Sequence, residues 1–167
     1  MSAFSDPIMR SHPSSAADNP DNFQIWDDEY TILFMKKFTE IHVALADYKM
    51  KLMQEASDLG SPFTRAMMLH YPDSQAIRGI IDQFMLGENI VMAPIFKESQ
   101  TVRDVVLPGP ATWTRLFSGE QIEVQDDSLT LEGVSCEMGL PAVYYRDTEG
   151  YTMSDVLDQY LQVEAFI

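Results

Sequence analysis

The chain contains one cysteine, Cys136, and no apolar run that approaches the length of a membrane span. A single thiol cannot form an internal disulfide, and Cys136 has no ligand residues at metal-binding spacing, so we expect a buried or partly buried free thiol in a reducing compartment. A transmembrane helix needs about 20 consecutive apolar residues, and residues 1–20 lack the apolar core of a signal peptide. The sequence therefore predicts a cytoplasmic protein without a membrane partner.

Basic residues are also scarce, because 11 Lys and Arg stand against 26 Asp and Glu, which gives a net charge of −15. Nucleic acids and anionic membrane surfaces are polyanions that bind basic surfaces, so this charge argues against both as partners. Neither His42 nor His70 has Cys, His or Asp at ligand spacing. We therefore expect no metal site and no cofactor.

The most informative stretch is an aromatic and aliphatic run that breaks at Gly87 and resumes as a β-branched run ending at Pro94. Gly87 permits the backbone conformation of a tight turn, and the Glu-Asn pair after it favours the turn itself. Residues 90–93 are apolar on both faces of a strand, and Pro94 removes a ladder donor. The pattern by itself predicts an ordinary core strand entered through a sharp turn.

The first part of the chain predicts a strand, a loop and a long helix. Residues 4–12 form a short apolar segment, and the Pro, Ser and Asx content of residues 13–20 favours a loop. An acidic triplet at residues 27–29 suits a helix N-terminus. Apolar residues then recur every three or four positions until Gly60, which is typical of a C-cap. We expect one helix over residues 29–59.

After Pro62 the apolar period changes from about 3.6 to 2, which indicates a strand over residues 63–71. A helical turn over 76–80 follows. Further short strands separated by turns predict a β-sandwich or an open antiparallel sheet; they fall at residues 102–107, 112–117, 121–124, 129–131 and 142–146. Thr152 and Asp155 resemble a capping box, and a short amphipathic helix should end the chain.

Several of these segments resemble glycoside hydrolase family 31, the α-glucosidases and their relatives. DQFMLG at residues 82–87 and VMAPI at 91–95 resemble the family signature, and PIMRSH at 7–12 is similar to its segment at the last barrel strand. The resemblance continues with RDVVLP at 103–108, TW at 112–113 and SGE at 118–120. Within the family, the sequence is most similar to the sulfoquinovosidase branch through MRSH at 9–12, DNFQ at 21–24 and LPAVYYR at 140–146. The resemblance to the family covers residues 4–146.

The resemblance implies an α/β plus β fold. Residues 1–60 would be the last strand, loop and long helix of a (β/α)8 barrel, and residues 61–147 an antiparallel β-sandwich domain. Residues 148–167 match nothing in the family and would form the terminal helix. A complete barrel takes about 250 residues, so the 167 residues here predict a C-terminal portion of a longer enzyme.

A retaining glycosidase uses two carboxyl groups about 5 to 5.5 Å apart. The resemblance implies that both are Asp residues on barrel strands upstream of this segment, so we assign no catalytic residue in the chain. The acidic residues that are present fit other roles. The acidic triplet at 27–29 suits a helix start, and Asp126 and Asp127 suit a solvated turn.

His12 and Arg10 are the substrate-binding candidates. By resemblance, His12 matches the family histidine that hydrogen-bonds sugar hydroxyls, and a neutral imidazole offers both a donor and an acceptor for that purpose. Arg10 lies two residues earlier and should point the same way on a strand, either to orient a catalytic carboxylate or to pair with an acidic neighbour. Residues 13–14 are Pro-Ser where sulfoquinovosidases have an acidic residue and Gly. The aromatic residues Trp113, Tyr144 and Tyr145 suit a sandwich core better than a carbohydrate platform.

Two functional hypotheses follow. In the first, the chain is the C-terminal portion of a retaining α-glycoside hydrolase that binds carbohydrate when the barrel is complete, with α-sulfoquinovosides as the finer expectation, and the chain alone is inactive. In the second, it is a non-catalytic structural or binding module derived from such an enzyme. An exposed barrel edge and an uncovered helix stripe would then favour self-association.

Overall fold

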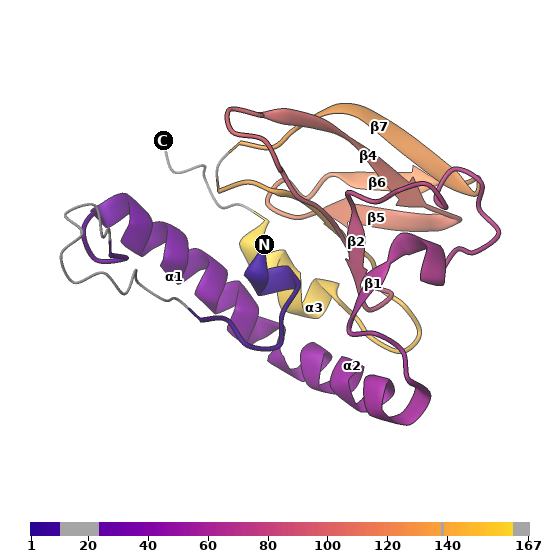
Figure 1. Ribbon diagram of the computed structural model, residues 1–167, viewed down its shortest axis with the longest axis horizontal. Coiled ribbons are helices and arrows are strands. Elements are labelled where there is room, and N and C mark those ends of the chain that lie inside the picture. The colour runs from indigo at the N-terminus through magenta and orange to yellow at the C-terminus, as the bar shows by residue number, and fades with distance from the viewer. Residues whose placement is uncertain (11–23, 138, 162–167) are drawn as a thin grey trace.

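The computed structural model describes residues 1–10, 24–137 and 139–161 in three layers (Figure 1). The central layer is a six-stranded antiparallel sheet in the order β1-β2-β3-β8-β5-β6, and a two-stranded ribbon of β4 and β7 lies over one face. The helices cover the other face. The strands are β1 (Thr64–Ala66), β2 (Phe84–Leu86), β3 (Ile90–Ala93), β4 (Val102–Pro108), β5 (Ala111–Arg115), β6 (Gln121–Val124), β7 (Ser128–Ser135) and β8 (Ala142–Tyr145).

The alternation of side chains along the central strands divides the core into two clusters. Ile90 and Met92 of β3 face the helices, whereas Val91 and Ala93 face the ribbon. All four are buried, because both faces of the sheet are covered. The antiparallel sheet and the buried strand at Ile90–Ala93 are thus as expected from the sequence.

The hairpin of β2 and β3 confirms the predicted turn. Leu86 pairs with Ile90, and Gly87 between them has φ +57°, a left-handed conformation that glycine adopts without a Cβ clash. A Cβ at Gly87 would lie 2.1 Å from the Tyr48 hydroxyl oxygen, so the helix layer also needs a glycine here.

The predicted long helix forms two consecutive helices, α1 (Glu29–Ala44) and α2 (Ala46–Leu59). Asp28 caps α1 by accepting a hydrogen bond from the Thr31 backbone N–H at 2.8 Å, and Gly60 ends α2 with φ +71°. At Leu45 the backbone departs from helical geometry, with ψ +4°, although its N–H still donates to the Ile41 carbonyl. The predicted boundaries are confirmed, and the break at Leu45 was not foreseen.

The predicted strand over residues 4–12 is wrong for the part that the structure describes. Residues Ser2–Phe4 form a 3-10 helix, η1, and residues 5–10 are irregular. Without a neighbouring strand the backbone bonds locally, as in the 2.9 Å bond from the Phe4 N–H to the Met1 carbonyl. The buried Phe4 ring packs edge-on against Phe38 of α1. The predicted barrel strand is therefore not seen, and residues 11 and 12 lie outside the described residues.

The strand predicted over residues 63–71 is shorter than expected. β1 pairs with β2 only from Thr64 to Ala66, and a 3-10 helix, η2 (Met67–Leu69), follows. The pairing ends at Ala66 because its partner, Phe84, is the first residue of β2. The preceding Gln83 side chain bonds instead to the backbone of Val106 in the ribbon.

At the end of the described chain lie α3 (Ser154–Leu157) and η3 (Asp158–Tyr160). The capping box predicted from Thr152 and Asp155 is wrong. The Ser154 N–H and hydroxyl instead donate to the Asp147 carboxylate, at 2.8 and 2.7 Å. Residues 162–167 of the predicted terminal helix lie outside the described residues. Among the helices that are described, none combines the length and apolarity needed to span a bilayer.

Candidate functional site

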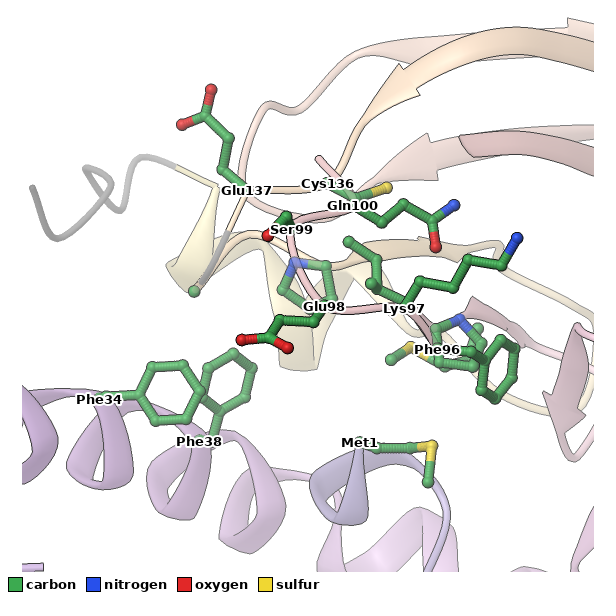
Figure 2. Close-up of a pocket in the computed structure, with 15 residues that line it drawn as sticks. Met1, Phe34, Phe38, Phe96, Lys97, Glu98, Ser99, Gln100, Cys136 and Glu137 are labelled. Atoms are coloured by element: carbon green, nitrogen blue, oxygen red, sulfur yellow. The ribbon is translucent and has the colours of Figure 1, made fainter. Parts of the chain in front are cut away.

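A hollow of about 490 Å³ opens between α1 and the loops that flank the ribbon (Figure 2). Phe34 and Phe38 form its helix side, and Met92 and Pro141 come from the sheet side. Lys97, Glu98 and Glu137 provide charge at the loops. Its walls are mainly apolar, which suits packing against an apolar group better than binding a sugar through many hydrogen bonds.

The reactive side chains near this hollow are held in structural contacts. The Lys37 ammonium donates to the Gly139 carbonyl at 2.9 Å and lies 4.0 Å from the centroid of the Phe117 ring. Burial lowers the pKa of Lys37 to about 8. Cys136 is a buried free thiol, as predicted, and burial raises its pKa, which keeps it protonated and unreactive.

The acidic residues considered from the sequence have structural roles. The Asp28 carboxylate accepts from the Thr31 hydroxyl at 2.6 Å, and this bond lowers the pKa of Asp28. Asp127 is exposed and accepts from the Ser74 hydroxyl at 2.6 Å. The expected helix start and solvated turn are thus confirmed.

The predicted sugar-binding residues remain predictions. Arg10 is exposed, and His12 lies outside the described residues. Trp113, Tyr144 and Tyr145 are core residues, each at most 1% exposed, so the platform alternative is wrong. The described residues contain no cluster of three or more His, Cys, Asp or Glu suited to a metal ion.

The two remaining histidines contact cations. His42 Nδ1 lies 2.6 Å from the Lys49 ammonium, and His70 Nε2 lies 3.0 Å from the Arg65 guanidinium. Burial, followed by the neighbouring cation, lowers the pKa of both histidines. Both are therefore neutral acceptors near pH 7, as expected for ordinary structural histidines.

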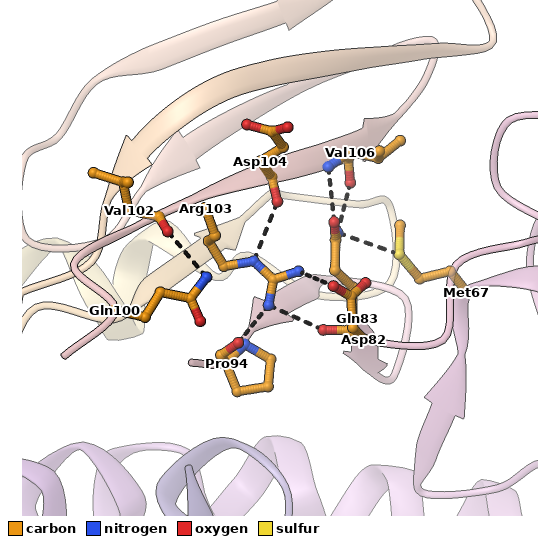
Figure 3. Close-up of polar contacts among 9 residues, drawn as sticks. All are labelled: Met67, Asp82, Gln83, Pro94, Gln100, Val102, Arg103, Asp104 and Val106. Carbon is orange, nitrogen blue, oxygen red and sulfur yellow. Dashed lines mark hydrogen bonds and ion pairs between the residues drawn. The ribbon is translucent and has the colours of Figure 1, made fainter. Parts of the chain in front are cut away.

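Sequence reasoning missed a polar cluster between the sheet and the ribbon, which we call the ribbon-side junction: Arg103, Asp82 and Gln83 (Figure 3). The Arg103 guanidinium donates to the Asp82 carboxylate at 2.8 Å and to the carbonyls of Asp82, Pro94 and Asp104. Gln83 bonds both the N–H and the carbonyl of Val106 at 2.9 Å. The sequence signal was present, because DQFMLG and RDVVLP are two of the quoted motifs. Their contact shows that these motif residues have a structural role.

A second cluster, the helix-side junction, consists of Asn89, Tyr48 and Gly87. Asn89 is 1% exposed, and its side-chain oxygen accepts from the Tyr48 hydroxyl at 3.0 Å. The Asn89 amide donates to the Arg146 carbonyl and the Thr148 hydroxyl, each at 3.0 Å, and to the Tyr151 carbonyl at 3.3 Å. This junction ties α2, the hairpin and the segment after β8 together.

This architecture defines a β-rich domain with an attached pair of helices. Residues 60–159 match the glycosyl hydrolase family 31 C-terminal domain. The chain is 36% identical over 146 residues to a sulfoquinovosidase of Agrobacterium fabrum, which covers 87% of this chain and 21% of the relative. The chain belongs to glycoside hydrolase family 31.

Other relatives agree. A sulfoquinovosidase of Escherichia coli is 28% identical and covers 87% of this chain. Among solved structures, a family 31 sulfoquinovosidase from E. rectale in complex with an aza-sugar inhibitor aligns with a TM-score of 0.76 at 28% identity, over 93% of this chain and 22% of that one. A soil-metagenome α-xylosidase complexed with xylose aligns at 0.70 and 27% identity, over 80% of this chain and 19% of that one. The chain spans about a fifth of the length of these relatives.

Proposed function

We propose that this chain supplies the C-terminal portion of a retaining α-glycoside hydrolase. The observation that carries the proposal is the family 31 C-terminal domain match over residues 60–159, with similarity to sulfoquinovosidases extending over 87% of the chain. The domain division at residues 60 and 147 belongs to the same proposal. Residues 1–60 would complete the catalytic barrel, and residues 61–147 would form the β-domain beside it.

Within this proposal the chain does not perform the bond cleavage. Retention requires two carboxyl groups about 5 to 5.5 Å apart, one attacking the anomeric carbon and one protonating the leaving oxygen. By resemblance to the family, both would be Asp residues outside this chain. The described acidic candidates cap a helix at Asp28 or bond a serine hydroxyl at Asp127. The contribution of the chain would be to bind and position.

His12 and Arg10 are the proposed points of substrate contact. A neutral imidazole presents one donor and one acceptor in fixed directions, which matches neighbouring sugar hydroxyls. Arg10 would orient a catalytic carboxylate of the completed site or pair with an acidic neighbour. The proposed substrate is an α-sulfoquinovoside, supported by the names of two relatives and one aligned structure.

A fusion tests this proposal. The 146 matched residues of this chain replace the corresponding segment of the Agrobacterium fabrum sulfoquinovosidase, and hydrolysis of aryl α-sulfoquinovoside and aryl α-glucoside is measured. We expect the fusion to be active, the chain alone to be inactive, and His12→Ala to lower kcat/KM of the fusion roughly tenfold or more.

Two outcomes contradict the proposal. Turnover by the chain alone, lost when one of its own carboxylates is replaced, would show that the chain holds catalytic residues. A folded fusion that hydrolyses neither substrate would instead favour the non-catalytic module.

A further inference from the structure

A second hollow, of about 450 Å³, opens where the loop between β3 and β4 meets the first part of the ribbon. Its size falls in the range of about 300 to 1,000 Å³ that is typical of small-molecule sites. Most of its lining side chains are polar, in contrast to those of the hollow beside α1. We call it the ribbon hollow. Its walls include Asp82, Phe96, Lys97, Gln100, Arg103 and Asp104.

Phe96 differs from the other phenylalanines of the chain. In the part of the chain that the structure describes, the others are buried or half-buried, whereas Phe96 is 64% exposed. Burying an aromatic ring is favourable, so the fold leaves an apolar surface unused here. A single exposed ring is common, and only its polar surroundings give it significance. Because Phe96 lines the ribbon hollow, a ligand in the hollow can cover the ring.

A tight turn in the loop between β3 and β4 places polar side chains next to this ring. The Gln100 N–H donates to the Lys97 carbonyl at 3.2 Å, and Ser99 between them has φ +64°. Serine is uncommon in this left-handed conformation, which strains the backbone. In Figure 2 the Lys97 and Gln100 side chains extend to the same side of the loop. The turn therefore presents an ammonium and an amide to the ribbon hollow.

Hydrogen-bonding atoms remain available around the ribbon hollow. Asp104 accepts from the Gly133 N–H through Oδ1 at 2.8 Å. Asp82 uses its Oδ2 to accept from Arg103. Among the described residues, no hydrogen bond or ion pair reaches the other oxygen of either carboxylate or the Lys97 ammonium. Carboxylates accept hydrogen bonds and an ammonium donates them, so the ribbon hollow offers both to a ligand.

The charges of the ribbon hollow cancel. Asp82 is paired with Arg103 (Figure 3), and Lys97 offsets Asp104. A hollow without net charge favours a neutral ligand, and the chain as a whole, at −15, repels anions. The described residues also lack a cluster of three or more His, Cys, Asp or Glu for a metal ion. A sugar ring combines hydroxyls, which both donate and accept, with an apolar C–H face, so it matches these walls.

We propose that the ribbon hollow binds a neutral sugar residue. The Phe96 ring packs against the C–H face of the sugar. The carboxylates of Asp82 and Asp104 accept hydrogen bonds from its hydroxyls, and the Lys97 ammonium donates to another of its oxygens. The inference goes beyond the proposed function, because the hollow is formed by described residues of this chain and needs neither His12 nor a completed barrel.

Titration of the isotope-labelled chain with maltotriose, followed by nuclear magnetic resonance, tests the inference without measuring an activity. We expect saturable shifts of the backbone amides of Gln100, Asp104 and Gly133. The dissociation constant should be on the order of 1 mM, as suits an open hollow that makes a few hydrogen bonds. Glycerol has hydroxyls but no ring face, so it is the matched ligand control and should give no saturable shift.

Variants of exposed aromatic residues separate ring packing from general stickiness. Phe96→Ala should weaken maltotriose binding about tenfold or more, because the packing surface is lost. Phe96→Tyr keeps the ring and should bind within about twofold of the wild type. Trp26→Ala is the matched control, because Trp26 is 71% exposed but does not line the ribbon hollow, and the dissociation constant should stay unchanged. Since both residues face water, none of these variants should move the thermal transition.

A further variant tests the polar side of the hollow. Lys97→Met keeps the apolar stem but removes the donor, so it should weaken maltotriose binding about threefold. Equal affinities of Lys97→Met and the wild type would contradict the hydrogen bond assigned to this ammonium.

Several outcomes overturn the inference. These are no saturable shift up to roughly 50 mM maltotriose, equal shifts with glycerol, shifts centred on Trp26, or binding that survives Phe96→Ala. The proposed function is decided separately, by turnover of the fusion. An active fusion with a chain that binds no sugar removes only the ribbon hollow as a site. Saturable binding by the chain together with a folded, inactive fusion keeps the ribbon hollow and removes the proposed function.

Discussion

The two polar junctions connect the layers of this molecule by different chemistry. The helix-side junction is neutral and closed, since Asn89 is 1% exposed and its side-chain amide group makes four hydrogen bonds, two with side chains and two with backbone carbonyls. The ribbon-side junction is charged and open on one side. The Arg103 side chain is 6% exposed, whereas the side chain of its ion partner Asp82 is 57% exposed.

This difference predicts how each junction tolerates change. When a neutral buried network loses a member, its partners are left without water and bear the full desolvation cost. At the ribbon-side junction water can reach the Asp82 carboxylate. Removing its ion partner should therefore cost less free energy of unfolding. The helix-side junction should therefore be the more sensitive of the two, although it carries no charge.

The largest effect should come from Gly87→Ala. The added Cβ would lie 2.1 Å from the Tyr48 hydroxyl and 2.6 Å from Leu52 Cδ2, so it would displace buried side chains of α2. Because the strain of a non-glycine residue at φ +57° adds to this clash, we expect a loss of about 3 to 4 kcal/mol in the free energy of unfolding. Chemical denaturation followed by circular dichroism measures this loss.

Gly60→Ala is the matched control. Gly60 has φ +71°, but a Cβ there meets nothing within 4 Å. The strain alone should cost about 1 kcal/mol. Equal losses at Gly60 and Gly87 would show that the contact between the hairpin and α2 does not constrain the helix-side junction.

The next effect is that of Asn89→Ala, for which we expect a loss of about 2 to 3 kcal/mol. The substitution removes the donors to the Arg146 and Tyr151 carbonyls and the acceptor of the Tyr48 hydroxyl. Tyr48→Phe removes only one hydroxyl and should cost less, about 1 kcal/mol. If Asn89→Ala proved no more costly than the Arg103 variant below, the proposed difference between the junctions would be wrong.

The sequence was most informative where local chemistry decides the structure. Gly87 with its two flanking strands, the Asp28 cap and the Gly60 end of α2 all depend on near neighbours in the chain. Residues 4–10 depend on distant partners. Their apolar pattern suits a strand, but a strand needs a neighbour to pair with, and Phe4 instead packs against α1 in a 3-10 segment.

The candidate site shows the same division. Motif similarity identified the family and marked Asp82, Gln83 and Arg103, but spacing along the chain could not show that Asp82 and Arg103 contact each other across 21 positions. The burial of Trp113 followed from its place on a strand. The role of His12 rests on resemblance alone, because its partners would come from the rest of the enzyme.

At the ribbon-side junction, Arg103→Ala should cost about 1 to 2 kcal/mol. It leaves the Pro94 and Asp104 carbonyls with one donor fewer, while water solvates Asp82. Asp82→Asn should cost less than about 1 kcal/mol, because the amide oxygen still accepts and the site is exposed. A larger loss from Asp82→Asn than from Arg103→Ala would show that the ion pair, and not the backbone bonds of Arg103, holds the ribbon.

The last comparison concerns a charge on the helix side of the sheet and appears as a pH dependence. The buried Lys49 ammonium donates to the Ala3 carbonyl at 2.8 Å, and burial lowers the pKa of Lys49 from 10.5 to about 8, with Asp6 opposing the shift. Between about pH 8 and 10.5 the unfolded chain therefore binds more protons at this lysine than the folded chain. The contribution of Lys49 to the free energy of unfolding should rise with pH across that window.

Lys49→Met isolates this contribution, because Lys37 remains in both proteins and its own dependence cancels in the difference. The stability of the wild type relative to Lys49→Met should increase from pH 8 to pH 10, as measured by urea denaturation at constant ionic strength. A relative stability that falls over this range would mean that the folded protein stabilises the charged form of Lys49. In that case the helix-side layer, like the ribbon-side junction, would compensate a buried cation through its electrostatic partners.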